Sequence, residues 1–156
     1  MKYSKRFKSF KQRGESVELL FMAQAALRGF RVCTPWGGVA PFDVGIDHGS
    51  HFIRVQVKSS TFRSGTGYCC QFRPNYFKKQ DYTLDQLDLF AAYVMPVDAW
   101  YLIPAAVLLR PKRKTDVTVY PVVPLKRDCY RYEQYREAWH LLAKSRRELG
   151  RYKQPR

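Results

Sequence analysis

An alternating segment at residues 52–58, with the sequence FIRVQVK, limits the fold more than any other part of this chain. Apolar and polar side chains alternate along most of it, which is typical of a β-strand with two different faces. The residues at 47–50, Asp-His-Gly-Ser, favour a turn, and residues 44–46 before them are apolar or glycine. We therefore predict a hairpin whose strands are residues 44–46 and 52–58.

The predicted hairpin brings two charged residues together. Asp43 directly precedes its first strand and Lys58 ends its second, so the turn folds the ammonium back beside the carboxylate. Gln56 shares a strand face with Lys58. An acidic oxygen can bind a divalent cation, and a nearby cation can orient water or stabilise growing negative charge. This combination of residue types suits the cleavage of phosphodiester bonds.

A helix is predicted before the hairpin, at residues 14–28. Gly29 is a stop signal, and the apolar residues fall near the helical period. These apolar positions are Leu19, Leu20, Met22, Ala23, Ala26 and Leu27. The helix also carries two glutamates that compete for a place in the site. Glu15 lies in the first turn, where the helix macrodipole favours an acid, and Glu18 lies nearly one turn later.

In this order the elements resemble the PD-(D/E)XK nucleases, whose split motif matches PFD at 41–43 and QVK at 56–58. Gln56 departs from the usual acid, and its amide offers a carbonyl oxygen without negative charge, so metal affinity should be weaker. The likeness is greatest to the intron-encoded homing endonucleases, which tolerate this glutamine, and to the archaeal Holliday junction resolvases. Both branches begin with a helix that carries a glutamate, and its spacing selects Glu18 over Glu15.

The resemblance implies a metal-dependent DNA endonuclease that uses Mg²⁺, with Mn²⁺ as a substitute. Asp43 would be the principal metal ligand, and Glu18 would hold the metal directly or through water. The backbone carbonyl of Val57 would complete the inner shell, and Gln56 would bind the metal or orient its water. Lys58 would polarise the attacking water and stabilise the charge that develops on the phosphate.

The charge of the chain independently favours a polyanionic partner. Its 156 residues contain 28 Lys and Arg against 13 Asp and Glu, a formal net charge of +15. Such a surplus attracts nucleic acid and makes binding salt-dependent, although charge alone reads no base sequence. The residues that we expect to contact DNA phosphates are Ser60, Arg63, Arg110, Lys112, Arg113 and Lys114.

The remaining patterns predict one α/β domain, a restriction-endonuclease-like core with a central mixed β-sheet flanked by helices. We expect a basic arm at residues 1–13, a single domain at 14–150 and a basic tail at 151–156. The further predicted strands are residues 30–32, 68–72, 89–94, 99–103 and 117–120, and the further helices are 105–109 and 132–149. The strand at 68–72 is expected to extend the hairpin into a three-stranded sheet.

Other features limit the class of protein. No apolar run reaches the ~18 residues needed to cross a bilayer, so we expect a cytoplasmic protein with reduced cysteines. The cysteines lack CxxC spacing and the histidines lack helical i, i+4 spacing, which disfavours a zinc site.

Three functional readings follow from the sequence. The first is a homing-type, site-specific endonuclease acting on double-stranded DNA. Because cutting a duplex requires reaching two strands, this reading implies a homo-oligomer, either a dimer or a tetramer. The second is a structure-selective nuclease that resembles a Holliday junction resolvase and prefers branched DNA. The third is a non-catalytic basic protein that binds nucleic acid, in which Gln56 marks lost catalysis.

Overall fold

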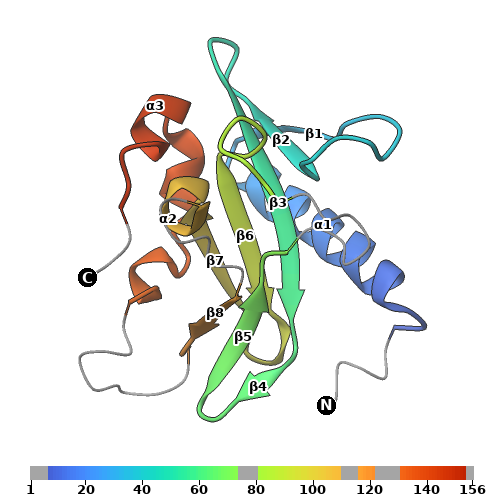
Figure 1. Cartoon of the computed structure of the whole chain (residues 1–156). Coiled ribbons are helices and arrows are strands. Elements are labelled where there is room, and N and C mark those ends of the chain that lie inside the picture. The colour runs from blue at the N-terminus through green and yellow to red at the C-terminus, as the bar shows by residue number, and fades with distance from the viewer. Residues whose placement is uncertain (1–6, 74–80, 110–115, 122–130, 154–156) are drawn as a thin grey trace.

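The computed structural model describes residues 7–73, 81–109, 116–121 and 131–153. The helices are α1 (Phe10–Leu27), α2 (Ala105–Leu109) and α3 (Arg146–Leu149), and the 3-10 turns are η2 (Met95–Val97), η4 (Glu133–Tyr135) and η5 (Trp139–Ala143). The strands are β1 (Arg31–Cys33), β2 (Val44–Asp47), β3 (Phe52–Ser60), β4 (Arg63–Ser64), β5 (Gly67–Gln71), β6 (Leu89–Val94), β7 (Ala99–Pro104) and β8 (Asp116–Val119). Figure 1 shows their arrangement.

A five-stranded sheet forms the centre of the molecule, with the strand order β1-β2-β3-β6-β7. β3 and β6 run parallel and the other neighbours run antiparallel, so the sheet is mixed, as predicted. The predicted hairpin is also present, because β2 pairs with β3 and Val44 lies opposite Val55. That register fixes where Asp43, the residue before β2, meets β3.

A smaller sheet corrects one prediction. Residues 68–72 were expected to extend the hairpin, but β5 pairs instead with β4 and β8 in a separate three-stranded sheet. The physical reason is that β3 already has a neighbour on each edge, β2 on one side and β6 on the other. An added strand has no free backbone groups of the central part of β3 to pair with.

α1 packs against the central sheet through a different face from the predicted one. The helix starts at Phe10, four residues before the expected start, because the Ser9 side chain caps it by accepting a hydrogen bond from the Gln12 N–H. Its buried residues are Val17, Phe21 and Ala25. Of the predicted apolar positions, Leu19 and Leu27 are exposed. The helix is apolar on more than one side, so its sequence did not identify the buried face.

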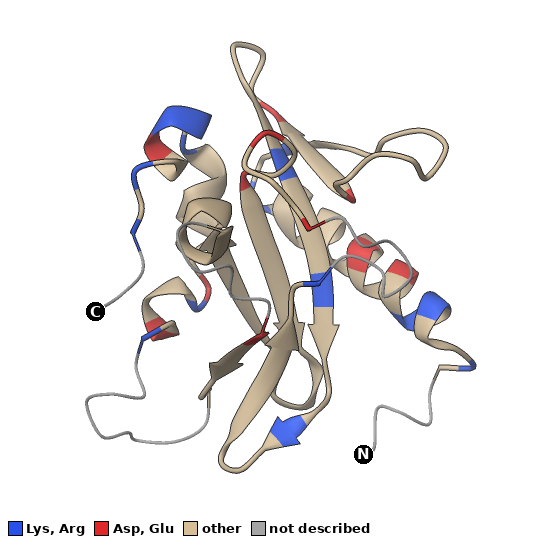
Figure 2. Cartoon of the chain, in the orientation of Figure 1, with Lys and Arg blue, Asp and Glu red and all other residues tan. Residues whose placement is uncertain are grey.

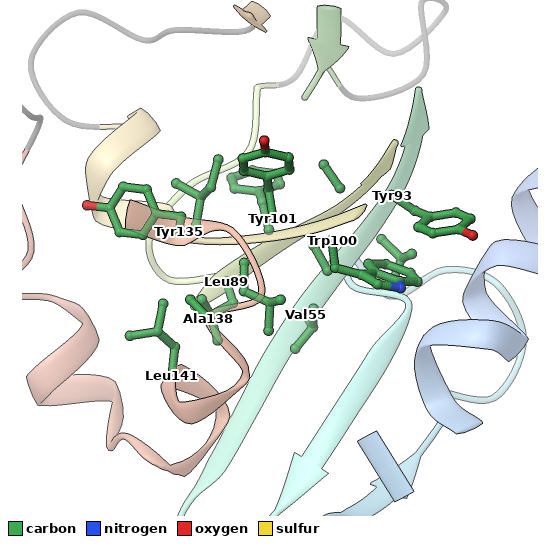
Figure 3. Packing of buried hydrophobic residues seen from close by; sticks show 14 of the residues in the cluster. Val55, Leu89, Tyr93, Trp100, Tyr101, Tyr135, Ala138 and Leu141 are labelled. Atoms are coloured by element: carbon green, nitrogen blue, oxygen red, sulfur yellow. The ribbon is translucent and has the colours of Figure 1, made fainter. Parts of the chain in front are cut away.

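Aromatic side chains fill the space between α1 and the sheet. Phe21 contacts the rings of Trp100 and Trp139, and Trp100 stacks on Tyr93 with a centroid distance of 4.7 Å. Figure 3 shows Tyr93 and Trp100 in this layer, with Val55 of β3 below them. Aromatic rings bury large apolar areas, so this layer fixes α1 over β3.

The closing helix predicted at residues 132–149 is wrong. The segment is divided into η4, η5 and α3, with Arg136 in an extended conformation and Glu137 at φ 50°. The open edge of β7 explains the break, because Glu137 N–H donates to the Trp100 carbonyl at 2.8 Å and Arg136 forms a β-bridge with Tyr101. Pairing with this edge satisfies strand groups that a continuous helix would leave bare.

No helix within the described ranges has the length and apolar character needed to cross a membrane.

Candidate active site

Asp43 is held in place by hydrogen bonds to β3, the strand that pairs with β2. Its backbone N–H donates to the Val55 carbonyl at 3.0 Å, which continues the β2–β3 pairing by one residue. Its carboxylate turns toward β3, where Oδ2 accepts a hydrogen bond from the Val57 N–H at 2.8 Å and another from the Gln56 side-chain amide. The acid therefore has a fixed orientation at the junction of two strands.

Two further charged residues share the electrostatic environment of Asp43. Lys58 extends from β3, and Glu18 extends from α1, which packs beside that strand. Figure 2 shows acidic positions on α1 and a basic position on the neighbouring β3. The structure thus brings together all four predicted side chains, including Gln56, from three elements that are separated in the sequence.

Burial shifts the pKa of each ionisable group in this cluster toward its neutral form. Burial raises the pKa of Asp43, against the opposing effects of the Val57 N–H, Lys58 and Gln56. Burial, with the negative charges of Asp43 and Glu15, raises the pKa of Glu18. Burial lowers the pKa of Lys58, although both acids favour its charge. The single ammonium therefore compensates two carboxylates incompletely, and a further cation would stabilise their charged forms.

The donor atoms in this cluster fit a hard divalent cation. Two carboxylates, the Gln56 amide oxygen and the Val57 backbone carbonyl are all oxygen donors, which Mg²⁺ and Mn²⁺ prefer. Within the described ranges no cluster of three or more His, Cys, Asp and Glu side chains could hold a metal. The amide at position 56 stands where a third acid would otherwise be.

Gln56 also affects the geometry of the cluster. Only 6% of its surface is exposed, and its amide nitrogen donates to Asp43. If the amide rotated by half a turn, its oxygen would face the carboxylate of Asp43, and the two acceptors would repel each other. A cation between them would remove that repulsion. The orientation of this amide is therefore expected to depend on whether a metal is bound.

The two candidate glutamates of α1 differ in their surroundings. Glu15 pairs with Lys11 across one turn at 3.8 Å, and 60% of its side chain is exposed. Glu18 is half-buried and interacts with Asp43 and Lys58. This arrangement favours Glu18 as the acid of the site.

The residues expected to contact DNA phosphates are placed less uniformly. Ser60 is only 3% exposed, and its hydroxyl donates to the Cys69 carbonyl at 2.6 Å, so burial opposes the predicted phosphate contact. Arg63 is exposed in β4, where its Nε donates to the Gly65 carbonyl at 3.1 Å. Arg110, Lys112, Arg113 and Lys114 lie outside the described residues.

Tyr82 is a neighbour of the site that sequence reasoning missed. The Lys58 Nζ atom lies 5.8 Å from the centre of its ring, a distance compatible with a cation–π contact. Burial and the charge of Asp43 raise the pKa of its phenol, which keeps the ring neutral. Tyr82 is 24 residues from Lys58, and no local pattern in the sequence signals such a long-range contact.

The comparison with known families now decides the class of protein. The model of the PD-(D/E)XK endonuclease family matches residues 8–142. The chain belongs to this family. Its members cleave phosphodiester bonds, and they generally use divalent metal ions. No match to this chain was found among curated proteins.

Two solved structures of similar proteins support the same fold. One is a bacterial homing endonuclease, I-Ssp6803I, with 26% sequence identity and a TM-score of 0.74 over 86% of this chain and 93% of that chain. The other is Hjc, a Holliday junction resolvase from the archaeal hyperthermophile Archaeoglobus fulgidus. It has 15% identity and a TM-score of 0.54 over 85% of this chain and 97% of that chain, which shows the shared fold.

Proposed function

We propose that this PD-(D/E)XK endonuclease cuts double-stranded DNA at specific sites, as a Mg²⁺-dependent enzyme of the homing type. The observation that carries the proposal is the cluster of Asp43, Glu18 and Lys58, in which the Val57 N–H holds the Asp43 carboxylate and the negative charge is unbalanced. The homing subtype is supported by the similarity to I-Ssp6803I, which extends over nearly all of that chain.

The side chains divide the chemical tasks between them. Asp43, Glu18, Gln56 and the Val57 carbonyl would hold Mg²⁺, which supplies a Lewis acid for the phosphate oxygens. Lys58 donates hydrogen bonds to the attacking water and to a phosphate oxygen, which orients one and stabilises charge on the other. Tyr82 covers the ammonium and limits its access to water.

A single cluster of this kind reaches one strand of a duplex. Two copies of the chain, related by two-fold symmetry, would place one cluster at each strand. We therefore propose that the active form is a homo-oligomer, a dimer or a tetramer. The assembly state can be measured by sedimentation, with and without DNA.

A plasmid assay tests the proposed chemistry. Supercoiled DNA is incubated with the protein in Mg²⁺, in Mn²⁺ or in EDTA, beside the variants Asp43→Ala and Lys58→Ala. We expect cleavage in either metal, none in EDTA, and a large loss in both variants. Binding without cleavage in every condition would instead support a non-catalytic nucleic-acid-binding protein.

A second measurement tests the homing subtype. Sequencing the DNA ends produced from a randomised library is expected to reveal one long preferred site. A labelled four-way junction then competes with its linear arms for the protein. Strong preference for the junction, with cuts near the branch and no preferred sequence, would replace the homing reading by a resolvase-like one.

A further inference from the structure

A hollow next to the proposed catalytic cluster has a chemical character of its own. It lies at the end of β3 and has a volume of about 240 Å³. Its polar lining comes from Arg13 of α1, from Ser59 and Thr61, and from Gln71 of β5, together with Ser60, whose hydroxyl already donates to the Cys69 carbonyl. A guanidinium, two hydroxyls and an amide can all donate hydrogen bonds. Such a lining suits a ligand that is rich in acceptor oxygens.

Arg13 is the charged group of this hollow, and it lacks an acidic partner. Its Nη1 atom contacts the Thr61 hydroxyl at 3.4 Å, while its Nε is buried without a hydrogen-bond partner. Within the described ranges no Asp or Glu forms an ion pair with it, although Lys11, Arg31, Arg54, Arg73, Lys144 and Arg146 each have one. Burial lowers its pKa. The guanidinium has thus lost hydration without gaining an anion.

The amino end of α1 adds to the positive potential at this place. A second hollow, of about 350 Å³, is lined by residues 7–10 and again by Arg13, so the same guanidinium lies between the two. Residues 7–10 include Lys8, and the first N–H groups of α1 carry the positive end of the helix dipole. Figure 2 shows the basic positions at this end of α1.

The hollow lies close to the proposed catalytic cluster, whether the separation is measured along the chain that continues from β3 or along α1. Thr61 is three residues beyond Lys58, which corresponds to about 10 Å along an extended chain. Arg13 is five residues before Glu18 on α1, which corresponds to about 7.5 Å along the helix axis. Successive nucleotides of one DNA strand are spaced by about 3.4 Å along the duplex axis. The hollow therefore lies within three nucleotides of the cluster.

We propose that this hollow, the Arg13 pocket, binds a backbone phosphate of the DNA strand being cut, within three nucleotides of the scissile phosphate. The proposal rests on the proposed nuclease function and adds a positioning role. A phosphate held here fixes the strand on the protein, so that the neighbouring scissile phosphate meets Asp43 and Lys58 in a reproducible register. The planar guanidinium suits a phosphate because it can form two parallel hydrogen bonds.

A binding experiment tests the pocket independently of cleavage. Anisotropy of a labelled duplex is measured in EDTA over a range of salt concentrations, for the wild type, Arg13→Gln, Arg13→Lys and the control Arg31→Gln. Arg31 lies in β1 and pairs with the exposed Asp47, so its replacement removes the same charge elsewhere. We expect Arg13→Gln to weaken binding by about tenfold and to reduce the salt slope by about 1. Arg31→Gln should change both much less, and Arg13→Lys should fall between.

A second variant and a second substrate locate the phosphate. Thr61→Val keeps the charge of Arg13 but removes its hydroxyl partner, and a smaller loss of affinity is expected. In a duplex that the wild type cuts, single phosphates near the cut are replaced by neutral methylphosphonates. Replacement at one position within three nucleotides of the cut should slow the wild type but leave Arg13→Gln unaffected.

The outcomes separate the pocket from the nuclease function. Equal salt slopes for Arg13→Gln and Arg31→Gln, in proteins with wild-type melting temperatures, would refute the pocket even if the wild type cuts DNA. A wild type that never cuts would refute the proposed function, while the slopes would still decide whether Arg13 binds a phosphate.

Discussion

Two aspartates flank β3, Asp88 buried and Asp43 partly buried, and the protein satisfies their charges in opposite ways. Asp43 directly precedes β2 and Asp88 directly precedes β6, the two neighbours of β3 in the sheet. Each carboxylate accepts a hydrogen bond from a backbone N–H of β3, Asp43 from Val57 at 2.8 Å and Asp88 from Arg54 at 2.9 Å. The two acids are therefore equivalent in backbone geometry.

Their charged partners differ. Both oxygens of Asp88 are bonded to guanidinium groups, from Arg54 and from Arg146, at 2.9 to 3.0 Å. Asp43 has the neutral amide of Gln56 and a nearby ammonium that it shares with Glu18. Asp88 is thus paired with two positive charges, whereas Asp43 shares one positive charge with a second acid. Compensated charge suits a structural role, whereas uncompensated charge suits a site that binds a cation.

Replacing Asp43 should produce the largest effect on activity. Asp43→Asn removes the charge that would hold the metal while keeping the shape of the side chain. We expect cleavage to fall on the order of 10³-fold or more. The melting temperature in EDTA should stay equal or rise, because a partly buried and poorly compensated charge is lost. Plasmid cleavage and thermal unfolding measure the two quantities. Full cleavage activity in this variant would contradict the role of Asp43.

The corresponding change at Asp88 should have the reverse outcome. Asp88→Asn leaves Arg54, with 16% of its side chain exposed, without its carboxylate, and the free energy of unfolding should drop by about 3 kcal/mol. Cleavage per folded molecule should be retained. The control Asp47→Asn breaks the exposed pair with Arg31 and should cost less than about 1 kcal/mol. Equal losses in the two variants, measured by urea denaturation, would show that Asp88 is not a structural anchor.

A single substitution at Gln56 would increase the negative charge around Asp43 and so widen its difference from Asp88. Gln56→Glu adds a third carboxylate to the cluster and should increase the affinity for Mn²⁺ on the order of tenfold, because each added anionic ligand strengthens binding. Calorimetric titration with Mn²⁺ measures this affinity. The matched variant Gln134→Glu places the same charge at an exposed position of η4, outside both the cluster and the Arg13 pocket, and should leave the affinity nearly unchanged. A weaker or equal affinity in Gln56→Glu would mean that residue 56 does not bind the metal.

The sequence predicts the part of this arrangement that local patterns determine. Alternation in residues 52–58 and the turn before them are local signals, so the hairpin, and with it the approach of Asp43 to Lys58, could be predicted. The placement of Glu18 came from the spacing of the family. The partners of Asp88 could not be predicted in this way. Its bonds to Arg54 and Arg146 span 34 and 58 residues, which no local pattern signals.

The failures of prediction have the same physical origin. Residues 132–149 contain good helix formers, yet contacts with the edge of β7 divide the segment at Glu137. Ser60 was expected at the surface, but pairing of β3 with β6 and contact with Cys69 bury it. In both places tertiary contacts override a local preference.

The pH dependence of stability gives the smallest and most specific test of the difference between the two aspartates. The folded protein raises the pKa of Asp43 above its ordinary value of 3.8 and that of Glu18 above 4.5. As pH rises from about 4 to 7, the unfolded chain releases these protons first, so the folded state is penalised and the melting temperature falls.

Asp43→Asn removes the contribution of Asp43 to that penalty, so its melting temperature in EDTA should decline less than that of the wild type between pH 4 and 7. Carboxylates that do not interact with Asp43 titrate alike in both proteins and cancel in the difference, and loss of the Asp43 charge also removes one cause of the raised pKa of Glu18. Saturating Mg²⁺ should also remove the decline in the wild type, because a bound cation favours the charged carboxylates. Parallel pH curves for the two proteins in EDTA would contradict the raised pKa of Asp43. They would also remove the electrostatic reason for placing a cation beside it.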